Sequence, residues 1–310
     1  MKALISAALI LMSSAAMASK PVSSGDDVPT RTNNLKIATG PAGKGYSKLF
    51  ANLKEVCSNF PMQEVKTTGG LDNLNVLSNK KADVGIAQLD TIKDLAPGDE
   101  SIAALKAVAV LNYNYLHVLT AATGYMQEQG REWYGAKEMG VVRVQKFSEL
   151  KGRTVALVGS AQLMAQVLQQ RVLKDYNMRF VNAPSDAEAA KMVLSGQVQA
   201  MMTVGGAPHG YVDGLTPANN LTMLPFDEDI GGVYSVRRIK YPKINIHGLK
   251  ILAVPNVLMT RDFSGKKSDQ VAALYSCLST NLQELKEGEY EPGWNEMKLD
   301  AVVDLPKFRK

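Results

Sequence analysis

The sequence predicts an α/β protein with two lobes, in which each lobe is a mixed sheet flanked by helices and two crossover strands form a hinge. From residue 35 onward, short apolar strands alternate with segments of helical period. Two blocks of elements follow a similar order without a strict repeat in sequence. Each block contains a strand, a glycine-containing loop and a helix, one near Gly40 and one near Gly159. A chain that leaves one lobe, builds a second and returns explains this pattern.

The first block opens with an apolar strand from Leu35, a glycine-rich loop and a helix that reaches about Cys57. Pro97-Gly98 ends the last helix of this block. Between these points the patterns predict a strand at 62–67, a turn at 68–70, a helix at 71–77, a buried strand at 83–87 and a helix at 91–95. A dense apolar stretch follows at 102–110, and 115–121 has strong strand character.

Residues 124–140 are polar, tipped by aromatic residues and without a clear period, so we expect an excursion on the surface. The second block starts at about Val141 and includes a helix from Ser160 to about Tyr176. Ser185-Asp-Ala-Glu188 has the pattern of a capped helix start. The remaining elements are expected as extended segments at 154–158, 198–204, 221–225, 235–241 and 249–260, and as a terminal helix at 268–286 with apolar residues along one side.

The amino-terminal segment has the pattern of an export signal. Lys2 supplies the positive start, residues 3–12 the apolar run and Ala16-Met17-Ala18 the cleavage site, so residues 1–18 predict a signal peptide. An uncleaved anchor is the alternative, but the run is shorter than the roughly 20 residues that span a bilayer. Residues 19–34 are rich in Pro, Ser and Asp and predict a flexible lead-in.

The expected lobe boundaries follow from the two crossovers. We expect the chain to cross near 116–122 and to return near 235–248. The first lobe is then 35–118 together with 249–310, and the second lobe is 119–248.

The charge argues against nucleic-acid binding, and the two cysteines raise the question of a disulfide. Removal of Lys2 lowers the formal net charge from +5 to about +4, and no Lys/Arg cluster with interleaved aromatic residues occurs, so nucleic acid is not an expected partner. Cys57 and Cys277 would lie in an oxidising compartment and in one lobe, so a disulfide and two free thiols are both open.

The glycine-rich loop of the first block is a candidate anion cradle. Backbone N–H groups at a helix N-terminus bind carboxylates, a lysine adds charge, and hydroxyl groups add donors. A tight strand-to-helix turn with a solvated lysine is the alternative. The candidate ligand-binding residues in this loop are Gly40, Gly43, Lys44, Gly45, Tyr46 and Ser47.

Further candidates stand where ligands bind in open α/β sheets, beyond the carboxyl ends of strands. Gln88 could bind an amide or a carboxylate, whereas Asp90 could instead cap the following helix and Asn73 could serve its turn. In the second block, the helix start at Ser160, Ala161 and Gln162 could bind the other end of a zwitterion, although Ser160 could be only an N-cap. Two glycines that allow close backbone approach and a tyrosine that could close over the ligand complete the set: Gly205, Gly206 and Tyr234.

Enzyme chemistry has little support in the sequence. His117, His209 and His247 lack metal-ligand spacing, and Gly159-Ser160-Ala161 lacks the glycine pattern of a nucleophile elbow. Carboxylates are scattered and unpaired. We therefore expect no catalytic residues, no metal and no cofactor.

Four stretches resemble the TAXI-type solute-binding proteins of TRAP transporters, a family of periplasmic two-lobe binding proteins. The most specific is Thr67–Leu74 followed by Ala82–Asp90. The others are Ile37–Gly40 with Gly43, Gly45 and Tyr46; Phe147–Val155 with Gly159-Ser160; and Asp186–Glu188, Ser195-Gly196, Gln199-Ala200 and Gly205–Pro208. Gly70 and Gln199 depart from the family's usual Ser and Asp, and the Gly159-Ser160 loop lacks a second glycine.

The resemblance implies a periplasmic receptor that closes two lobes on a small organic acid or an amino acid such as glutamate. The receptor would deliver this solute to a TRAP-type membrane permease, and we expect it to act as a monomer. An ABC-type or sensor-coupled binding protein is the alternative on the same fold, and an exported enzyme is a third hypothesis.

Overall fold

The computed structural model describes residues 34–133, 136–299 and 303–309. Within them, ten strands form one mixed sheet in the order β2-β1-β3-β12-β4-β9-β7-β8, with β10 beside β4 and β11 beside β12. The expected signal peptide at 1–18 and nearly all of the lead-in at 19–34 lie outside the described residues. Among the described residues, no helix combines the length and the apolar character that crossing a membrane requires.

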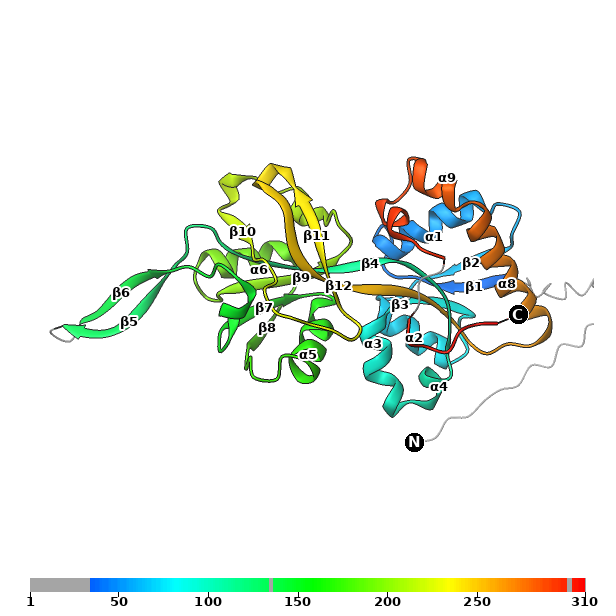
Figure 1. Cartoon of the computed structure of the whole chain (residues 1–310), viewed down its shortest axis with the longest axis horizontal. Coiled ribbons are helices and arrows are strands. Elements are labelled where there is room, and N and C mark those ends of the chain that lie inside the picture. The colour runs from blue at the N-terminus through cyan, green and yellow to red at the C-terminus, as the bar shows by residue number, and fades with distance from the viewer. Residues whose placement is uncertain (1–33, 134–135, 300–302, 310) are drawn as a thin grey trace, which may run out of the picture. The chain divides into compact units, whose positions relative to one another are not determined.

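The first half of the sheet begins with three parallel strands that have helices on both faces. Strands β1 (Leu35–Ala38), β2 (Met62–Val65) and β3 (Val84–Gln88) pair in parallel. One face is covered by α1 (Gly45–Val56) and the other by α2 (Gly70–Ser78), α3 (Leu89–Leu95) and α4 (Glu100–Ala103) (Figure 1). Strand β3 is buried along its whole length, as expected of a central parallel strand.

Two long strands run through both halves of the sheet. Strand β4 (Lys106–Ala121) pairs with β12 (Ile246–Thr260) up to Tyr115, and from there pairs with β9. Strand β12 starts as the partner of β11 (Ser235–Tyr241) and becomes a partner of β3 only from Asn256. Figure 1 shows both strands crossing between the halves. Strand β12 therefore changes its partner between Ala253 and Asn256.

The second half repeats the architecture of the first. Strands β7 (Thr154–Val158), β8 (Arg179–Ala183) and β9 (Ala200–Gly205) pair in parallel. Helix α6 (Asp186–Leu194) starts as expected, because the Ser185 hydroxyl accepts the Glu188 N–H at 3.2 Å. The other elements here are α5 (Ala161–Arg171), α7 (Gly210–Asp213) and β10 (Leu221–Met223).

The strand character expected at 115–121 is confirmed, and the surface excursion expected at 124–140 takes the form of a hairpin. Residues 102–110 and 115–121 belong in large part to one strand, and residues 124–140 form most of a hairpin, β5 (Tyr125–Trp133) and β6 (Ala136–Val142). This hairpin projects from the second half (Figure 1). With Met126, Met139 and Val141 exposed, its sequence lacks the alternation of a half-buried strand.

Two expectations about helix ends were wrong. Helix α5 ends at Arg171 rather than near Tyr176, because Tyr176 instead packs into the core and its carbonyl accepts the Gly152 N–H. The terminal helix is divided into α8 (Gly265–Thr280) and α9 (Leu282–Glu287). At the break, the Asn281 side-chain amide donates to the Cys277 carbonyl at 2.9 Å. An asparagine side chain that binds the backbone in this way competes with helix propagation.

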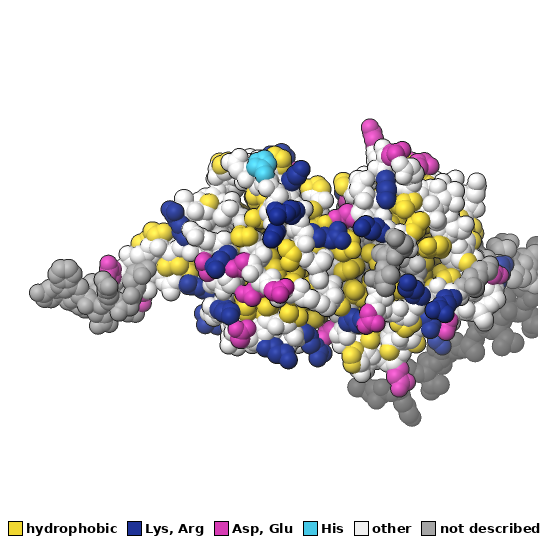
Figure 2. Space-filling model, in the orientation of Figure 1, with side chains coloured by type: hydrophobic (Ala, Val, Ile, Leu, Met, Phe, Trp, Pro, Cys, Tyr) yellow, Lys and Arg dark blue, Asp and Glu magenta, His cyan; other side chains and the backbone are white. Residues whose placement is uncertain are grey.

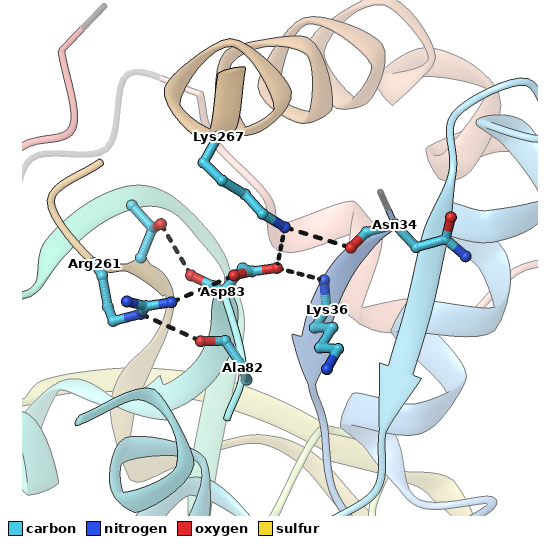
Figure 3. A network of polar contacts seen from close by, with 7 residues as sticks. Asn34, Lys36, Ala82, Asp83, Arg261 and Lys267 are labelled. Atoms are coloured by element: carbon cyan, nitrogen blue, oxygen red, sulfur yellow. Dashed lines mark hydrogen bonds and ion pairs between the residues drawn. The ribbon is translucent and has the colours of Figure 1, made fainter. Parts of the chain in front are cut away.

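Two contacts fasten α8 to the first half. Cys57 and Cys277 form a disulfide with Cα atoms 6.1 Å apart, which joins the end of α1 to α8. Asp83, at the start of β3, accepts from Lys267 Nζ at 2.6 Å, from the Lys36 N–H at 3.0 Å and from Arg261 at 3.4 Å (Figure 3). Elsewhere, Lys and Arg side chains are scattered among Asp and Glu over the face shown in Figure 2.

Candidate functional site

The candidate residues lie where parallel strands of both halves end. Strands β1 and β3 lead into the Gly40–Ser47 loop and Gln88, and strands β7 and β9 lead into 159–162 and 205–209. Open α/β sheets bind ligands beyond the carboxyl ends of their strands. The chain therefore presents the expected set of loops from each half.

The glycine-rich loop turns directly into α1. Gly43 has a φ of +71°, which favours glycine, and Lys44 is the exposed N-cap residue with no capping bond from its side chain. The Ser47 hydroxyl donates to Glu64 at 2.8 Å within the first half. Of the loop's candidate donors, Ser47 is thus already engaged and Lys44 remains exposed.

Asn73 holds two strand ends together. It is completely buried, and its side-chain amide donates to the carbonyl groups of Thr39 and, at 2.7 Å, of Ile86. Its side-chain oxygen accepts from the Thr67 hydroxyl at 2.7 Å. With three partners inside the protein, Asn73 has a structural role at the ends of β1 and β3.

A cluster of amides joins the loop to the crossover strands. The Tyr46 hydroxyl donates to Asn256 Oδ1 at 2.6 Å, and Asn256 Nδ2 donates to Asn112 at 2.9 Å and to Asn114 at 3.0 Å. Burial and the nearby negative charge of Asp90 raise the pKa of Tyr46, so this hydroxyl stays protonated. The predicted ligand residue Tyr46 therefore also ties α1 to β12.

Gln88 and Asp90 are both buried, but they differ in their hydrogen-bond partners. Gln88 lies opposite Asn256 in the strand register, and its Nε2 atom has no hydrogen-bond partner. Helix α3 begins at Leu89, so Asp90 lies in its first turn and is not the N-cap. Asp90 accepts from the Thr91 N–H at 2.7 Å and from the Tyr234 hydroxyl at 3.1 Å. Burial raises the pKa of Asp90 to about 6.

Tyr234 belongs to a contact between α3 and the second half. Its hydroxyl reaches Asp90, and one helical turn later Asp94 forms an ion pair with Arg171 of α5 at 2.9 Å. The Tyr234 hydroxyl is therefore engaged with the protein itself.

The helix start in the second half leaves a hydroxyl available. Ser160 is the exposed N-cap residue of α5, but its side chain makes no capping hydrogen bond. Ala161 is buried, and the Gln162 N–H donates to the Gly159 carbonyl at 3.1 Å.

After β9 the chain folds a histidine against its own backbone. A Cβ atom at Gly205 would lie 2.6 Å from the His209 ring, whereas one at Gly206 would meet nothing within 4 Å. Position 205 thus requires glycine so that the ring can approach. The peptide bond before Pro208 is cis.

His209 is held by a buried hydrogen-bonded chain. The backbone N–H of His209 donates to the Tyr241 hydroxyl at 2.6 Å, and that hydroxyl lies 2.7 Å from His117 Nε2. Burial lowers the pKa of His117 to about 3, so the ring is neutral. Because Tyr241 has one proton and accepts from His209, it donates to His117 Nε2, and His117 Nδ1–H donates to the Tyr115 carbonyl at 3.0 Å.

Three buried side-chain atoms within the described part of the chain have no hydrogen-bond partner: Gln88 Nε2, Asp186 Oδ1 and His209 Nδ1. All three residues stand at strand ends, one in the first half and two in the second. Burial lowers the pKa of His209, the charge of Asp186 raises it and the charge of Lys44 lowers it. Both charges therefore act on this ring. Buried polar atoms without partners cost free energy, so these three atoms are the exceptions among the buried polar side-chain groups of the described residues.

Two cavities lie away from these strand ends. The larger, of about 410 Å³, is lined by residues of β4, α8 and the carboxyl-terminal segment, including Val108, Tyr275 and Phe308. Over the described residues, no group of three or more His, Cys, Asp or Glu side chains is arranged to hold a metal ion.

Sequence reasoning missed His209, Asp186 and Asn256. The sequence indicates for His209 only a possible metal ligand without suitable spacing, although the residue directly follows Gly205–Pro208. Asp186 was assigned to a helix start. Asn256 interrupts the apolar run 249–260, and a polar residue inside a buried strand was the available signal.

Comparison with known proteins gives a family and a fold. The sequence pattern of the NMT1-like family matches residues 37–233, whereas no curated protein sequence matches the chain. The solved structure of Tv2483 bound to L-arginine has a TM-score of 0.51 and 13% identity, and the match covers 88% of this chain and 96% of that one. The GluR0 ligand-binding core in complex with L-glutamate has a TM-score of 0.49 and 13% identity, and the match covers 82% of this chain and 96% of that one. An ancestral arginine-binding protein bound to arginine has a TM-score of 0.48 and 14% identity, and the match covers 82% of this chain and 96% of that one.

The family match covers more than half of the chain, and the expected α/β fold with two lobes is confirmed. The chain belongs to the NMT1-like family and has the fold of the two-lobe periplasmic binding proteins.

Proposed function

We propose that this chain is a solute receptor that holds a small acidic or zwitterionic molecule, such as a dicarboxylate or an amino acid, between its two lobes. The observation that carries this proposal is the set of unpartnered buried atoms on Gln88, Asp186 and His209. A ligand with both donors and acceptors would satisfy them. The L-arginine in Tv2483 is consistent with such a solute.

Backbone groups add to the proposed site. Helix α1 begins after a glycine-rich loop and α5 begins after Gly159, and helix N-termini favour anions. The exposed hydroxyl of Ser160 and the charge of Lys44 are further groups that suit a carboxylate.

The proposed mechanism is hinge closure between lobes at 35–118 with 249–310 and at 119–248. Strand pairing favours moving the second boundary into 253–256, where β12 leaves β11 and joins β3. A ligand that contacts both lobes binds the closed state better and shifts the balance towards it.

For location and partner, we propose export to the periplasm and delivery to a TRAP-type permease. The signal-peptide pattern at 1–18 supports export, and Thr67–Leu74 with Ala82–Asp90 supports the TAXI-type assignment. Affinity purification from solubilised membranes separates the alternatives. Recovery of an ABC permease or a sensor kinase instead of a TRAP permease would contradict this part of the proposal.

A thermal-shift screen against dicarboxylates and the twenty standard amino acids tests the receptor function. We expect at least one member to raise the melting temperature, since binding to the native state stabilises it. The Gln88→Ala variant should lose most of this shift, while Gln63→Ala, an exposed glutamine on edge strand β2, should retain it. No shift with any compound would contradict the proposal.

A further inference from the structure

We propose that Gln88 and Asp186 select a solute with opposite charges at its two ends, with Gln88 binding its acidic end and Asp186 binding its basic end. This inference rests on the proposed receptor function and narrows it to solutes that carry a cationic and an anionic group. Each half of the protein would then bind one charged end of the solute.

Gln88 is equipped to bind an acceptor. The residue is only 5% exposed, and its unpartnered atom is Nε2, which is a donor and never an acceptor. The neighbouring amide of Asn256 is engaged at both ends, by Tyr46 and by Asn112 and Asn114. A carboxylate is the partner that gives the strongest hydrogen bond to such a donor.

Asp186 is equipped to bind a donor. Its buried Oδ1 atom has no partner, and an ionised carboxylate only accepts hydrogen bonds. The capping role at the start of α6 is filled by Ser185, so the Asp186 Oδ1 atom is not needed for the helix start. An ammonium or guanidinium group provides both the missing donors and the opposite charge.

Together, the Gln88 donor and the Asp186 carboxylate disfavour solutes whose charged groups all have the same sign. A dicarboxylate would set its second carboxylate against Asp186, whereas a diamine would set donors against Gln88 Nε2. His209 lies within range of the charges of Asp186 and Lys44, and its unpartnered Nδ1 atom can donate or accept. The ring can therefore contact either end without changing the selection.

Matched ligands test the polarity directly. For every standard amino acid that stabilises the protein, isothermal titration compares it with an analogue that lacks every amino group and with an analogue that lacks every carboxylate; for glutamate these are glutarate and propylamine. We expect each analogue to bind at least about tenfold more weakly, as expected for a lost charge-assisted hydrogen bond.

Two variants separate the roles of the two residues. Asp186→Asn should reduce the preference for the amino acid over its des-amino analogue by about tenfold, and Gln88→Met should do the same for the des-carboxy analogue. Glu188→Gln is the matched control. It lies on the same helix turn but is exposed and paired with Lys191, and it should leave both preferences unchanged.

The outcomes are distinct. Dicarboxylates that bind as tightly as amino acids, or preferences that survive both variants, would overturn the inference and leave the receptor function standing. If no amino acid and no dicarboxylate stabilises the protein, both proposals fall. Melting temperatures of the unliganded variants show whether each one is folded.

Discussion

At the scale of single residues, buried polar side chains at the strand ends fall into two groups. Asn73 and Asn256 have partners for both ends of their amides, so they fix the backbone and the crossover strands. Gln88, Asp186 and His209 each keep an unpartnered atom. Substitution of a fully hydrogen-bonded side chain should lower the stability of the protein, whereas substitution of a side chain with an unpartnered atom should lower its affinity for a ligand.

The structural role of Asn73 gives the first prediction. Asn73→Asp replaces two donated hydrogen bonds by a carboxylate that faces carbonyl groups, so the free energy of unfolding in urea should fall by about 3 kcal/mol. Asn75→Asp, an exposed position on the same helix, should change it by less than about 0.5 kcal/mol. Equal effects at the two positions would contradict the role given to Asn73.

Asp90 gives a prediction about pH. Its pKa is raised to about 6 in the folded protein, so the folded state binds a proton that the unfolded state has released between about pH 4 and 6. Its contribution to stability is therefore largest below pH 4 and declines by about 3 kcal/mol as the pH rises to 6, with no change above that.

The measurement compares unfolding in urea of the native sequence and Asp90→Asn between pH 4 and 8. The native protein should lose stability relative to the variant as the pH rises to 6. A constant difference between the two proteins would show that Asp90 titrates near its usual pKa.

At the scale of elements, helix α3 provides a contact between the halves that does not depend on a ligand. Asp90 and Asp94 are four residues apart, hence on one helix face, and reach Tyr234 and Arg171 of the second half. Such a contact favours the arrangement in which the halves are joined.

We expect Arg171→Gln to increase the radius of gyration of the unliganded protein in small-angle X-ray scattering. The exposed arginine contributes less than about 1 kcal/mol, which still shifts a two-state balance by up to about fivefold. Lys191→Gln removes an exposed ion pair within one helix and is the control. An unchanged radius in both variants would contradict the role of this contact.

Most elements could be predicted from the sequence because local patterns determine them, as at the Ser185 cap of α6 and the buried run of β3. Strand β8 and the early end of α5 could not. Three residues of β8 are exposed, which hides its pattern, and tertiary packing of Tyr176 overrides local helix preference. At the proposed site, the sequence singles out the glycine-rich loop and Gln88, but an unpartnered atom such as Asp186 Oδ1 is visible only in three dimensions.

At the scale of the whole molecule, one covalent link joins distant parts of the chain. The disulfide between Cys57 and Cys277 spans 220 residues of sequence. A link that closes so long a loop reduces the entropy of the unfolded chain, so the double variant Cys57→Ser, Cys277→Ser should lose about 2–5 kcal/mol in urea unfolding. Dithiothreitol should destabilise the native protein and leave the double variant unchanged; an equal response of both would contradict a disulfide.

The arrangement of the molecule as a receptor depends on contacts from both halves to one solute. Hydrogen–deuterium exchange, with and without a stabilising amino acid, tests this claim most directly. We expect slower exchange at 40–47 in the first half together with 159–162 and 205–209 in the second, because a solute between the lobes shields both sets of strand ends. Protection confined to one half would contradict capture between two lobes.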